Sequence, residues 1–416
     1  MSEGPRAVTA ARIVTCDPSR MGSLGIIEHG AIVVGAGKIS WIGPRTELDP
    51  RLAIDDAGDA VITPGLVDAH THAAWAGSRH GEYAVRMAGG DYEAIAAAGG
   101  GIVSTQHAVA GVSEDALTEQ LGARLARMAA LGVTTCEVKS GYGLEAEYEL
   151  KQLRAIARVS LRPDLPRVVA TFLALHAIPP SARADRDGYV RGVVETLLPT
   201  VAHDKLATFV DAYVDANAFR IDEARILGKK AQSLGLGLRL HVGQFADVGG
   251  AELAAELGAR SADHLEHVSD EGIGRLAASG THAVLLPVAS FTLGQAPPPV
   301  AALRAAGVPL VVASDANPGT APSESLPLAM ALAVATYGLT PAEAILGVTR
   351  GAALSLGLTS NAAGARPRGS LTPGARPDIV VWDLPHEHAI LQPWGAAKTH
   401  LVLRNGRPIG GSATRS

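Results

Sequence analysis

The sequence predicts an α/β fold, a TIM-like (β/α)8 barrel with a small β-sandwich domain built from both termini. Two observations predict it. Short apolar runs alternate with helix-like segments through residues 64–363, and strand-like segments punctuated by glycine occupy residues 1–63 and 364–416. A doubly wound open sheet is the alternative for the central part. The 416 residues, 47% of them hydrophobic, are enough to bury a large core.

The two ends of the chain share a texture that is typical of short strands. Their apolar runs are rich in Val and Ile, and the turn signals Pro373-Gly374 and Asn405-Gly406 lie close to the later runs. The expected strands are 7–16, 31–34, 39–42, 378–382 and 399–403. Because strands occur at both ends and no long helix pattern separates them from the centre, we expect one small domain assembled from both ends.

The central segment has the rhythm of successive strand–helix units. The expected strands are 65–70, 133–139, 167–175, 209–214, 237–241, 262–267, 283–287 and 309–313. Amphipathic helices are expected between them, for example at 113–131, 221–234 and 249–257. The apolar stretch 326–334 is far shorter than the ~20 residues that span a bilayer, so we expect a buried helix there.

Composition and charge exclude several classes of function. Lys and Arg number 36 against 41 Asp and Glu, a formal net charge of −5, and no basic block stands out. Binding to nucleic acid needs a concentrated basic surface, so we expect no nucleic-acid partner. The two cysteines, Cys16 and Cys136, cannot build a disulfide framework and suit a reducing compartment. With no signal peptide at the N-terminus and no spanning segment, we expect a cytoplasmic protein without a membrane partner.

Histidines and acids gather at the carboxyl ends of the expected barrel strands, where barrel enzymes build their active sites. His70 and His72 close the first strand, and side chains two apart on an extended segment point the same way. His241 ends the fifth strand and Asp315 follows the eighth. An isolated His-x-His is usually chance, but the joint placement predicts a metal site. Three neutral imidazoles and one carboxylate suit Zn²⁺ or Fe²⁺.

Two of these residues are also candidates for proton transfer. A metal ion would lower the pKa of water towards ~7 and polarise a carbonyl group under attack. Asp315 could orient that water or take its proton, and His264, in the sixth strand, could act as a general acid or base. The glycine clusters at 99–101 and 141–143 match neither a dinucleotide fingerprint nor a P-loop, so we expect tight loops there.

The segment 64–72, Pro-Gly-Leu-Val-Asp-Ala-His-Thr-His, resembles the opening signature of the amidohydrolase superfamily. Within it, the chain is most similar to the imidazolonepropionase family. The similarity extends over nearly the whole chain, and its most specific blocks are Lys-Ser-Gly-Tyr-Gly-Leu at 139–144 and Asp-Ala-Asn-Pro-Gly at 315–319. The resemblance implies hydrolysis of the cyclic C–N bond of 4-imidazolone-5-propanoate to N-formimino-L-glutamate, in histidine degradation.

The resemblance also implies a cofactor, partners and roles for residues. It implies one divalent metal ion, zinc or iron, held by His70, His72, His241 and Asp315, with His264 as a catalytic histidine beside it. It implies a small anionic substrate and a homodimer. The residues expected around the substrate are Arg79, Tyr92, Tyr142, His176, Gln244, Asn317 and Gly319. Arg79 can bind a propanoate carboxylate with two parallel hydrogen bonds.

Gln244 departs from the family pattern. Many members carry glutamate three residues after the third metal histidine, where this chain has Gln244. A glutamate can shuttle a proton, whereas an amide can only donate and accept hydrogen bonds. The position is therefore a weaker candidate for a catalytic acid or base, and deamination of a ring is harder to support than hydrolysis. Another amidohydrolase, such as an aminohydrolase or an amide hydrolase, and a catalytically silent binding protein remain the alternatives.

Overall fold

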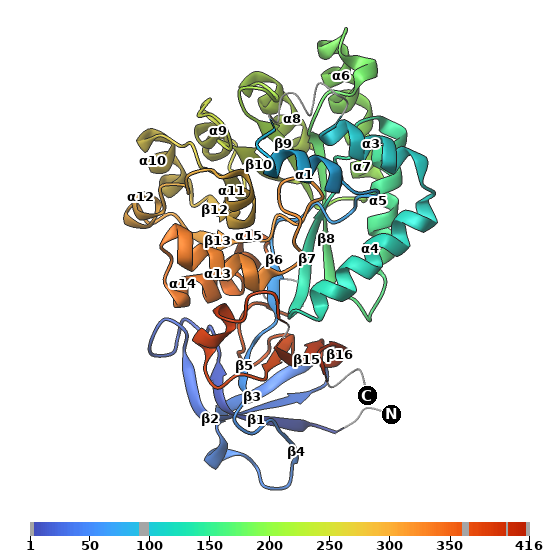
Figure 1. Ribbon diagram of the computed structural model, residues 1–416. Coiled ribbons are helices and arrows are strands. Elements are labelled where there is room, and N and C mark those ends of the chain that lie inside the picture. The colour runs from blue at the N-terminus through green and yellow to red at the C-terminus, as the bar shows by residue number, and fades with distance from the viewer. Residues whose placement is uncertain (1–3, 91–99, 360–365, 397, 413–416) are drawn as a thin grey trace.

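The computed structural model describes residues 4–90, 100–359, 366–396 and 398–412. The chain forms a barrel ringed by helices and, on one side of it, a small sheet that holds both termini (Figure 1). The described helices include none with the length and apolar character needed to cross a bilayer.

Eight parallel strands form the barrel. They are hydrogen-bonded in chain order from β6 to β13, and the bridge between Thr71 and Ala316 joins the two ends of this path. The strands are β6 (Leu66–Asp68), β7 (Val133–Lys139), β8 (Arg167–Leu175), β9 (Phe209–Val214), β10 (Gly237–Val242), β11 (Ser261–His264), β12 (His282–Leu285) and β13 (Leu310–Val312). Consecutive order without a reversal rules out the doubly wound alternative and confirms the predicted barrel.

Helices alternate with these strands and cover the outside of the barrel (Figure 1). They are α1 (His80–Met87), α3 (Ile102–Gly111), α4 (Glu114–Ala129), α5 (Ala146–Ser160), α6 (Arg186–Gly192), α7 (Leu198–His203), α8 (Ile221–Ser233), α9 (Gly250–Glu256), α10 (Asp270–Ser279), α11 (Pro287–Leu293), α12 (Val300–Ala305), α13 (Leu326–Tyr337), α14 (Pro341–Gly347) and α15 (Arg350–Ser355). A π-helical turn, Val193–Leu197, links α6 to α7.

Local sequence explains where individual helices begin and end. Ser113 caps the N-terminus of α4, because its side-chain hydroxyl accepts a hydrogen bond from the backbone N–H of Ala116. The apolar stretch at 326–334 lies in α13, which is largely buried as expected and ends at Tyr337, with Gly338 as its C-cap. Gly338 has a φ of 71°, a left-handed conformation that glycine adopts at no steric cost.

The small sheet combines strands from both ends of the chain, as the sequence predicted for the small β part of the fold. Its order is β16-β15-β14-β5-β1-β2-β3, with β4 paired to β1. The strands are β1 (Arg6–Val14), β2 (Ile26–Gly35), β3 (Lys38–Pro44), β4 (Ala53–Asp56), β5 (Val61–Pro64), β14 (Ile379–Trp382), β15 (Thr399–Arg404) and β16 (Arg407–Gly410). Its core is aliphatic, with Ile13, Ile32, Ile39, Ile62 and Ile379 fully buried.

Four strands of this sheet differ from the expected ones. β2 begins at Ile26 rather than at 31, and β4, β5 and β16 were not expected. β4 is exposed throughout and carries two aspartates, so it has no alternating apolar pattern to reveal it. The division at 63/64 falls within β5, next to β6, whereas the division at 363/364 lies outside the described residues; both boundaries stay predictions.

Candidate metal centre

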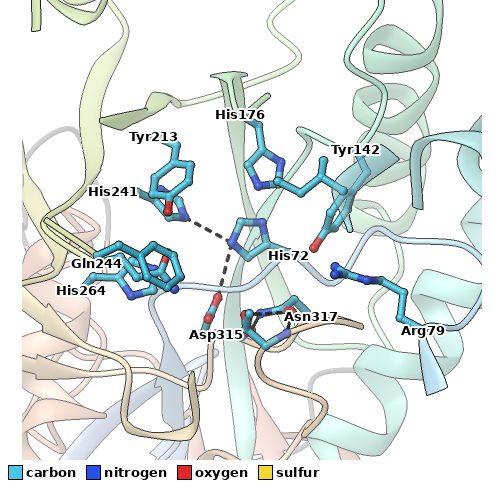
Figure 2. Close-up of a pocket in the computed structure, with 13 residues that line it drawn as sticks. His72, Arg79, Tyr142, His176, Tyr213, His241, Gln244, His264, Asp315 and Asn317 are labelled. Carbon is cyan, nitrogen blue, oxygen red and sulfur yellow. Dashed lines mark hydrogen bonds and ion pairs between the residues drawn. The ribbon is translucent and has the colours of Figure 1, made fainter. Parts of the chain in front are cut away.

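Three histidines from two strand ends meet at the carboxyl-terminal mouth of the barrel. His70 and His72 follow β6, and His241 lies in β10; all three are buried. Their potential ligand nitrogens all lie within 4.8 Å of one another. The Nε2 atoms of His72 and His241 are 3.2 Å apart (Figure 2). Residues separated by about 170 positions in the sequence therefore share one point in space, as predicted.

Asp315 completes the cluster from the other end of the barrel sheet. Its Oδ1 atom lies 3.4 Å from His70 Nε2 and 3.4 Å from His72 Nε2. The backbone fixes this meeting, because Asp315 donates its N–H to the carbonyl of His70 at 3.0 Å. Asp315 also has a φ of 54°, a left-handed conformation that costs a non-glycine residue free energy and is found at functional sites.

The donor atoms of this cluster fit a cation. Among the described residues, His70 Nε2 and Asp315 Oδ1 are buried and have no hydrogen-bond partner, and a buried polar atom in that state is costly. Burial holds the pKa of His70, His72 and His241 well below the usual value, so their imidazoles are neutral. Burial also raises the pKa of Asp315 to about 7, and a cation would favour the carboxylate instead.

Two buried aspartates orient the histidines from behind. Asp263 Oδ2 lies 2.6 Å from His70 Nδ1, and Asp211 Oδ2 lies 3.0 Å from His241 Nδ1. At His70 this contact is a hydrogen bond, and such a carboxylate keeps a proton on Nδ1 and leaves the Nε2 lone pair directed towards a metal; at His241 the carboxylate is close but Nδ1 makes no hydrogen bond with any described residue. Sequence reasoning missed both aspartates. For Asp211, an acidic residue inside the otherwise apolar strand β9 was the available signal, whereas Asp263 lies in the short polar strand β11 and gave no such signal.

A buried lysine links these carboxylates beneath the histidines. Lys139 Nζ lies 2.9 Å from Glu137 Oε1 and 2.8 Å from Asp211 Oδ2, and Asp263 Oδ2 is 3.9 Å away. Burial lowers the pKa of Lys139, but its carboxylate neighbours outweigh burial and the net pKa is raised. The ammonium therefore stays charged and balances part of the acidic charge under the metal cluster.

His264 lies beside the cluster without joining it. The centroid of its ring is 5.6 Å from that of His241 and 6.0 Å from that of His70. Its Nδ1 atom is 3.5 Å from Glu266 Oε2. Burial lowers the pKa of His264, but the carboxylates of Glu266, Asp315 and Asp263 together outweigh burial and the net pKa is raised. This placement separates His264 from the three histidines that could hold a metal.

The expected substrate residues surround the same pocket. Arg79, Tyr142, His176, Gln244 and Asn317 line it together with His72, His241, His264 and Asp315 (Figure 2). Four further lining residues were not predicted from the sequence: Ile102, Tyr213, Phe245 and Thr320. Of the two remaining predicted residues, Gly319 is not among those that line the pocket, and Tyr92 lies outside the described residues.

Two basic side chains that line the pocket, Arg79 and His176, have different charge states. Arg79 Nε donates to Glu82 Oε2 at 2.8 Å, and its guanidinium points into the pocket (Figure 2). Gly319 lies against it, and a Cβ there would lie 2.2 Å from Arg79 Nη1, so a larger residue would displace the guanidinium. His176 Nδ1 is 2.7 Å from the carbonyl of Gly141, and burial lowers the pKa of His176 to about 4. His176 is therefore neutral, with Nε2 left as an acceptor.

Asn317 and Gln244 are held by the loops that carry them. The Asn317 Oδ1 atom accepts from the backbone N–H of Gly319 and Thr320, and its Nδ2 donates to the carbonyl of Asp315 at 2.7 Å. Its amide thus shapes the loop that presents Asp315. The carbonyl of Gln244 accepts from Gln295 Nε2 at 2.8 Å, and its side chain faces the pocket (Figure 2).

Comparisons with known proteins agree with this geometry. The amidohydrolase family model matches residues 61–410. The imidazolonepropionase of Paracoccus denitrificans (strain Pd 1222) is 46% identical, over 96% of this chain and 98% of its own length. That of Caulobacter vibrioides (strain NA1000 / CB15N) is 43% identical, over 95% and 98%, and that of Shewanella oneidensis is 41% identical, over 95% and 97%.

Solved structures share the fold at lower sequence identity. E. coli guanine deaminase aligns with a TM-score of 0.73 at 15% identity, over 98% of this chain and 100% of its own. A Xanthomonas campestris adenosine deaminase with bound zinc aligns with a TM-score of 0.69 at 20% identity, over 97% and 92%. Together with the near full-length relatives, the barrel and its cluster of histidines show that this chain belongs to the amidohydrolase family and, within it, to the imidazolonepropionases.

Proposed function

We propose that the pocket hydrolyses the ring of 4-imidazolone-5-propanoate to N-formimino-L-glutamate, and that His70, His72, His241 and Asp315 hold one divalent ion, zinc or iron. The chain is a hydrolase that acts on a cyclic amide C–N bond. The assignment of ligands depends on the convergence of these four buried side chains. Two of them, His70 and Asp315, face one another with Nε2 and Oδ1 atoms that have no hydrogen-bond partner among the described residues. When bound, the ion supplies acidification of water and polarisation of the carbonyl under attack.

His264 is the proton carrier in this proposal. Its Nδ1 faces Glu266, which leaves Nε2 as the nitrogen available to the pocket. Nε2 takes a proton from the attacking water and returns it to the ring nitrogen as the C–N bond breaks. An imidazole can accept a proton in the first step and donate it in the second, which is typical of general acid–base catalysis.

Arg79 and its neighbours bind the substrate. The propanoate carboxylate is an anion, and the guanidinium of Arg79 offers it two parallel charged hydrogen bonds. In Figure 2, Arg79 and His264 lie on opposite sides of His72, so a substrate anchored at Arg79 extends its ring towards His264. His176 Nε2 accepts a hydrogen bond from a ring N–H, since its Nδ1 proton is engaged by Gly141.

Gln244 favours hydrolysis over deamination. It lines the pocket next to His264 but carries an amide, which cannot pass a proton to a ring nitrogen. His264 alone must then move the proton, and ring opening needs only this one carrier. Release of ammonia from an aminated ring would favour an aminohydrolase instead.

A single assay tests the proposal. Purified protein, with its metal content measured on the same sample, is mixed with 4-imidazolone-5-propanoate, and the ultraviolet absorbance of the ring is followed. We expect about one divalent ion per chain and loss of the absorbance. His203→Ala is a matched control, because His203 is 88% exposed in its side chain and lies far along the chain from the cluster; it should retain full turnover. Metal-replete protein that leaves the absorbance unchanged would reject this substrate.

A further inference from the structure

The far side of His264 contains a buried chain of polar groups that the reaction as described does not use. His264 Nδ1 and Glu266 Oε2 are buried and lie 3.5 Å apart. Neither atom has a hydrogen-bond partner that meets strict geometry among the described residues. An unpartnered buried nitrogen and an unpartnered buried carboxylate oxygen are each costly alone, so each is the evident partner of the other.

The backbone is bent so that these two side chains meet. His264 has a φ of 82° and Leu265 a φ of 68°, which puts two successive non-glycine residues in the left-handed region. Without this bend, the chain would continue in the extended direction of β11 beyond His264. This conformation is unfavourable for residues with a Cβ, and it persists where surrounding structure imposes it, commonly at functional sites.

Glu266 is itself held from two helices. Ser290, in α11, donates its hydroxyl proton to Glu266 Oε1 at 2.5 Å. Because that proton is used, Ser290 Oγ accepts from the hydroxyl of Tyr337, in α13, at 2.5 Å. Burial raises the pKa of Tyr337, so the phenol keeps its proton and remains a donor. The carboxylate is thus fixed at one oxygen, and its other oxygen faces His264.

We propose that Glu266 is the positioning residue of His264, a role that rests on the proton transfer proposed above. Its Oε2 holds the proton on Nδ1, so that Nε2 presents its lone pair to the pocket. When Nε2 takes a proton from water, the ring becomes a cation next to the Glu266 carboxylate, which stabilises it. The ring returns to neutrality when Nε2 gives that proton to the departing ring nitrogen. Glu266 keeps its charge throughout, as the acid behind a catalytic histidine does in hydrolytic triads.

The test replaces the charge while keeping the shape. In Glu266→Gln we expect bound metal near one ion per chain, a KM within about twofold of the wild type, and a kcat lower by about 10²-fold or more. Glu266→Asp should recover part of the lost kcat because it restores the charge. Glu119→Gln, at an exposed position of α4, is the matched control and should behave as the wild type. A kcat within threefold of the wild type in metal-replete Glu266→Gln would overturn the proposal.

A second measurement does not depend on turnover. In the zinc-loaded protein, a hydrogen bond from Nδ1–H to a carboxylate gives a downfield proton resonance, assigned by its loss in His264→Ala. We expect this resonance in the wild type and a marked upfield shift or loss in Glu266→Gln. An unchanged resonance in Glu266→Gln would overturn the positioning role. If the resonance responds as expected while the wild type fails to open the imidazolone ring, the positioning role stands and the proposed substrate fails.

Discussion

The mouth of the barrel and the small sheet bury different kinds of side chain. At the mouth, fully or nearly fully buried positions hold histidines, aspartates and Lys139. Non-glycine residues with left-handed backbones occur in both regions: His264, Leu265 and Asp315 at the mouth, and His29, Ala36 and Asn405 in or between strands of the small sheet. The core of the small sheet consists of aliphatic residues in regular, mostly antiparallel strands. Among the described residues, buried polar atoms without a hydrogen-bond partner occur in both regions, but those at the mouth include histidine nitrogens and Asp315 Oδ1, whereas those beside the small sheet belong to Arg368, Arg376, Asp378 and Arg404.

This difference indicates how the free energy of folding is distributed. Burying a charged or polar group costs free energy unless it is paired, whereas burying an isoleucine is favourable by about 1.5–3 kcal/mol. The mouth therefore contributes chemistry at some cost in stability, and the aliphatic cores contribute stability. Substitutions in the two regions should have separable effects, on metal binding and kcat in one and on the free energy of unfolding in the other.

The largest separable effect on catalysis is expected at His264. His264→Ala should keep its bound metal, because His264 lies outside the three-histidine group, and should lose about 10²–10⁴-fold in kcat, as expected for a general acid–base group. Metal analysis and steady-state kinetics on one preparation check this. Loss of the metal in this variant would show that His264 is a ligand rather than a proton carrier.

A smaller effect is expected at the aspartate behind His70. Asp263→Asn keeps the shape but removes the charge that orients the imidazole, which lies 2.6 Å away. We expect metal affinity to fall by about 10–100-fold, measured by competition with a chelator. Circular dichroism would confirm that the variant is folded. An affinity equal to that of the wild type would mean that the charge of Asp263 does not support the metal site.

The smallest effect on chemistry is expected in the small sheet. Ile32→Ala removes a fully buried side chain and should lower the free energy of unfolding by about 2–5 kcal/mol, measured by denaturant titration. The kcat of the folded variant should match that of the wild type. A large fall in kcat with metal retained would show that the small sheet is coupled to the mouth and would end the contrast between the two regions.

Residues that follow a periodic or spaced pattern could be predicted from the sequence. The apolar runs predicted the barrel strands. Placement at the ends of those strands predicted the candidate metal ligands His70, His72, His241 and Asp315. The expected strand 262–267 ends earlier, at His264, because the left-handed backbones of His264 and Leu265 cannot continue a strand. β4 was missed because it is exposed and polar.

Contacts that depend on strand register could not be predicted. Asp263 pairs with His241 across β10 and β11, yet its carboxylate reaches His70, from another strand. Glu266 reaches Ser290 and Tyr337 only because a bent backbone and two helices converge there. The local sequence around Asp263 and Glu266 contains no pattern that predicts these contacts. The expected homodimer and cytoplasmic location are not tested by the fold and stay predictions.

The central claim is that one divalent ion binds where the four side chains converge. Anomalous diffraction from crystals of the zinc-loaded protein tests it most directly. The account predicts one strong anomalous peak within coordination distance, about 2.0–2.2 Å, of His70, His72, His241 and Asp315. A peak elsewhere with none at this cluster, or metal-replete crystals without a peak there, would contradict it.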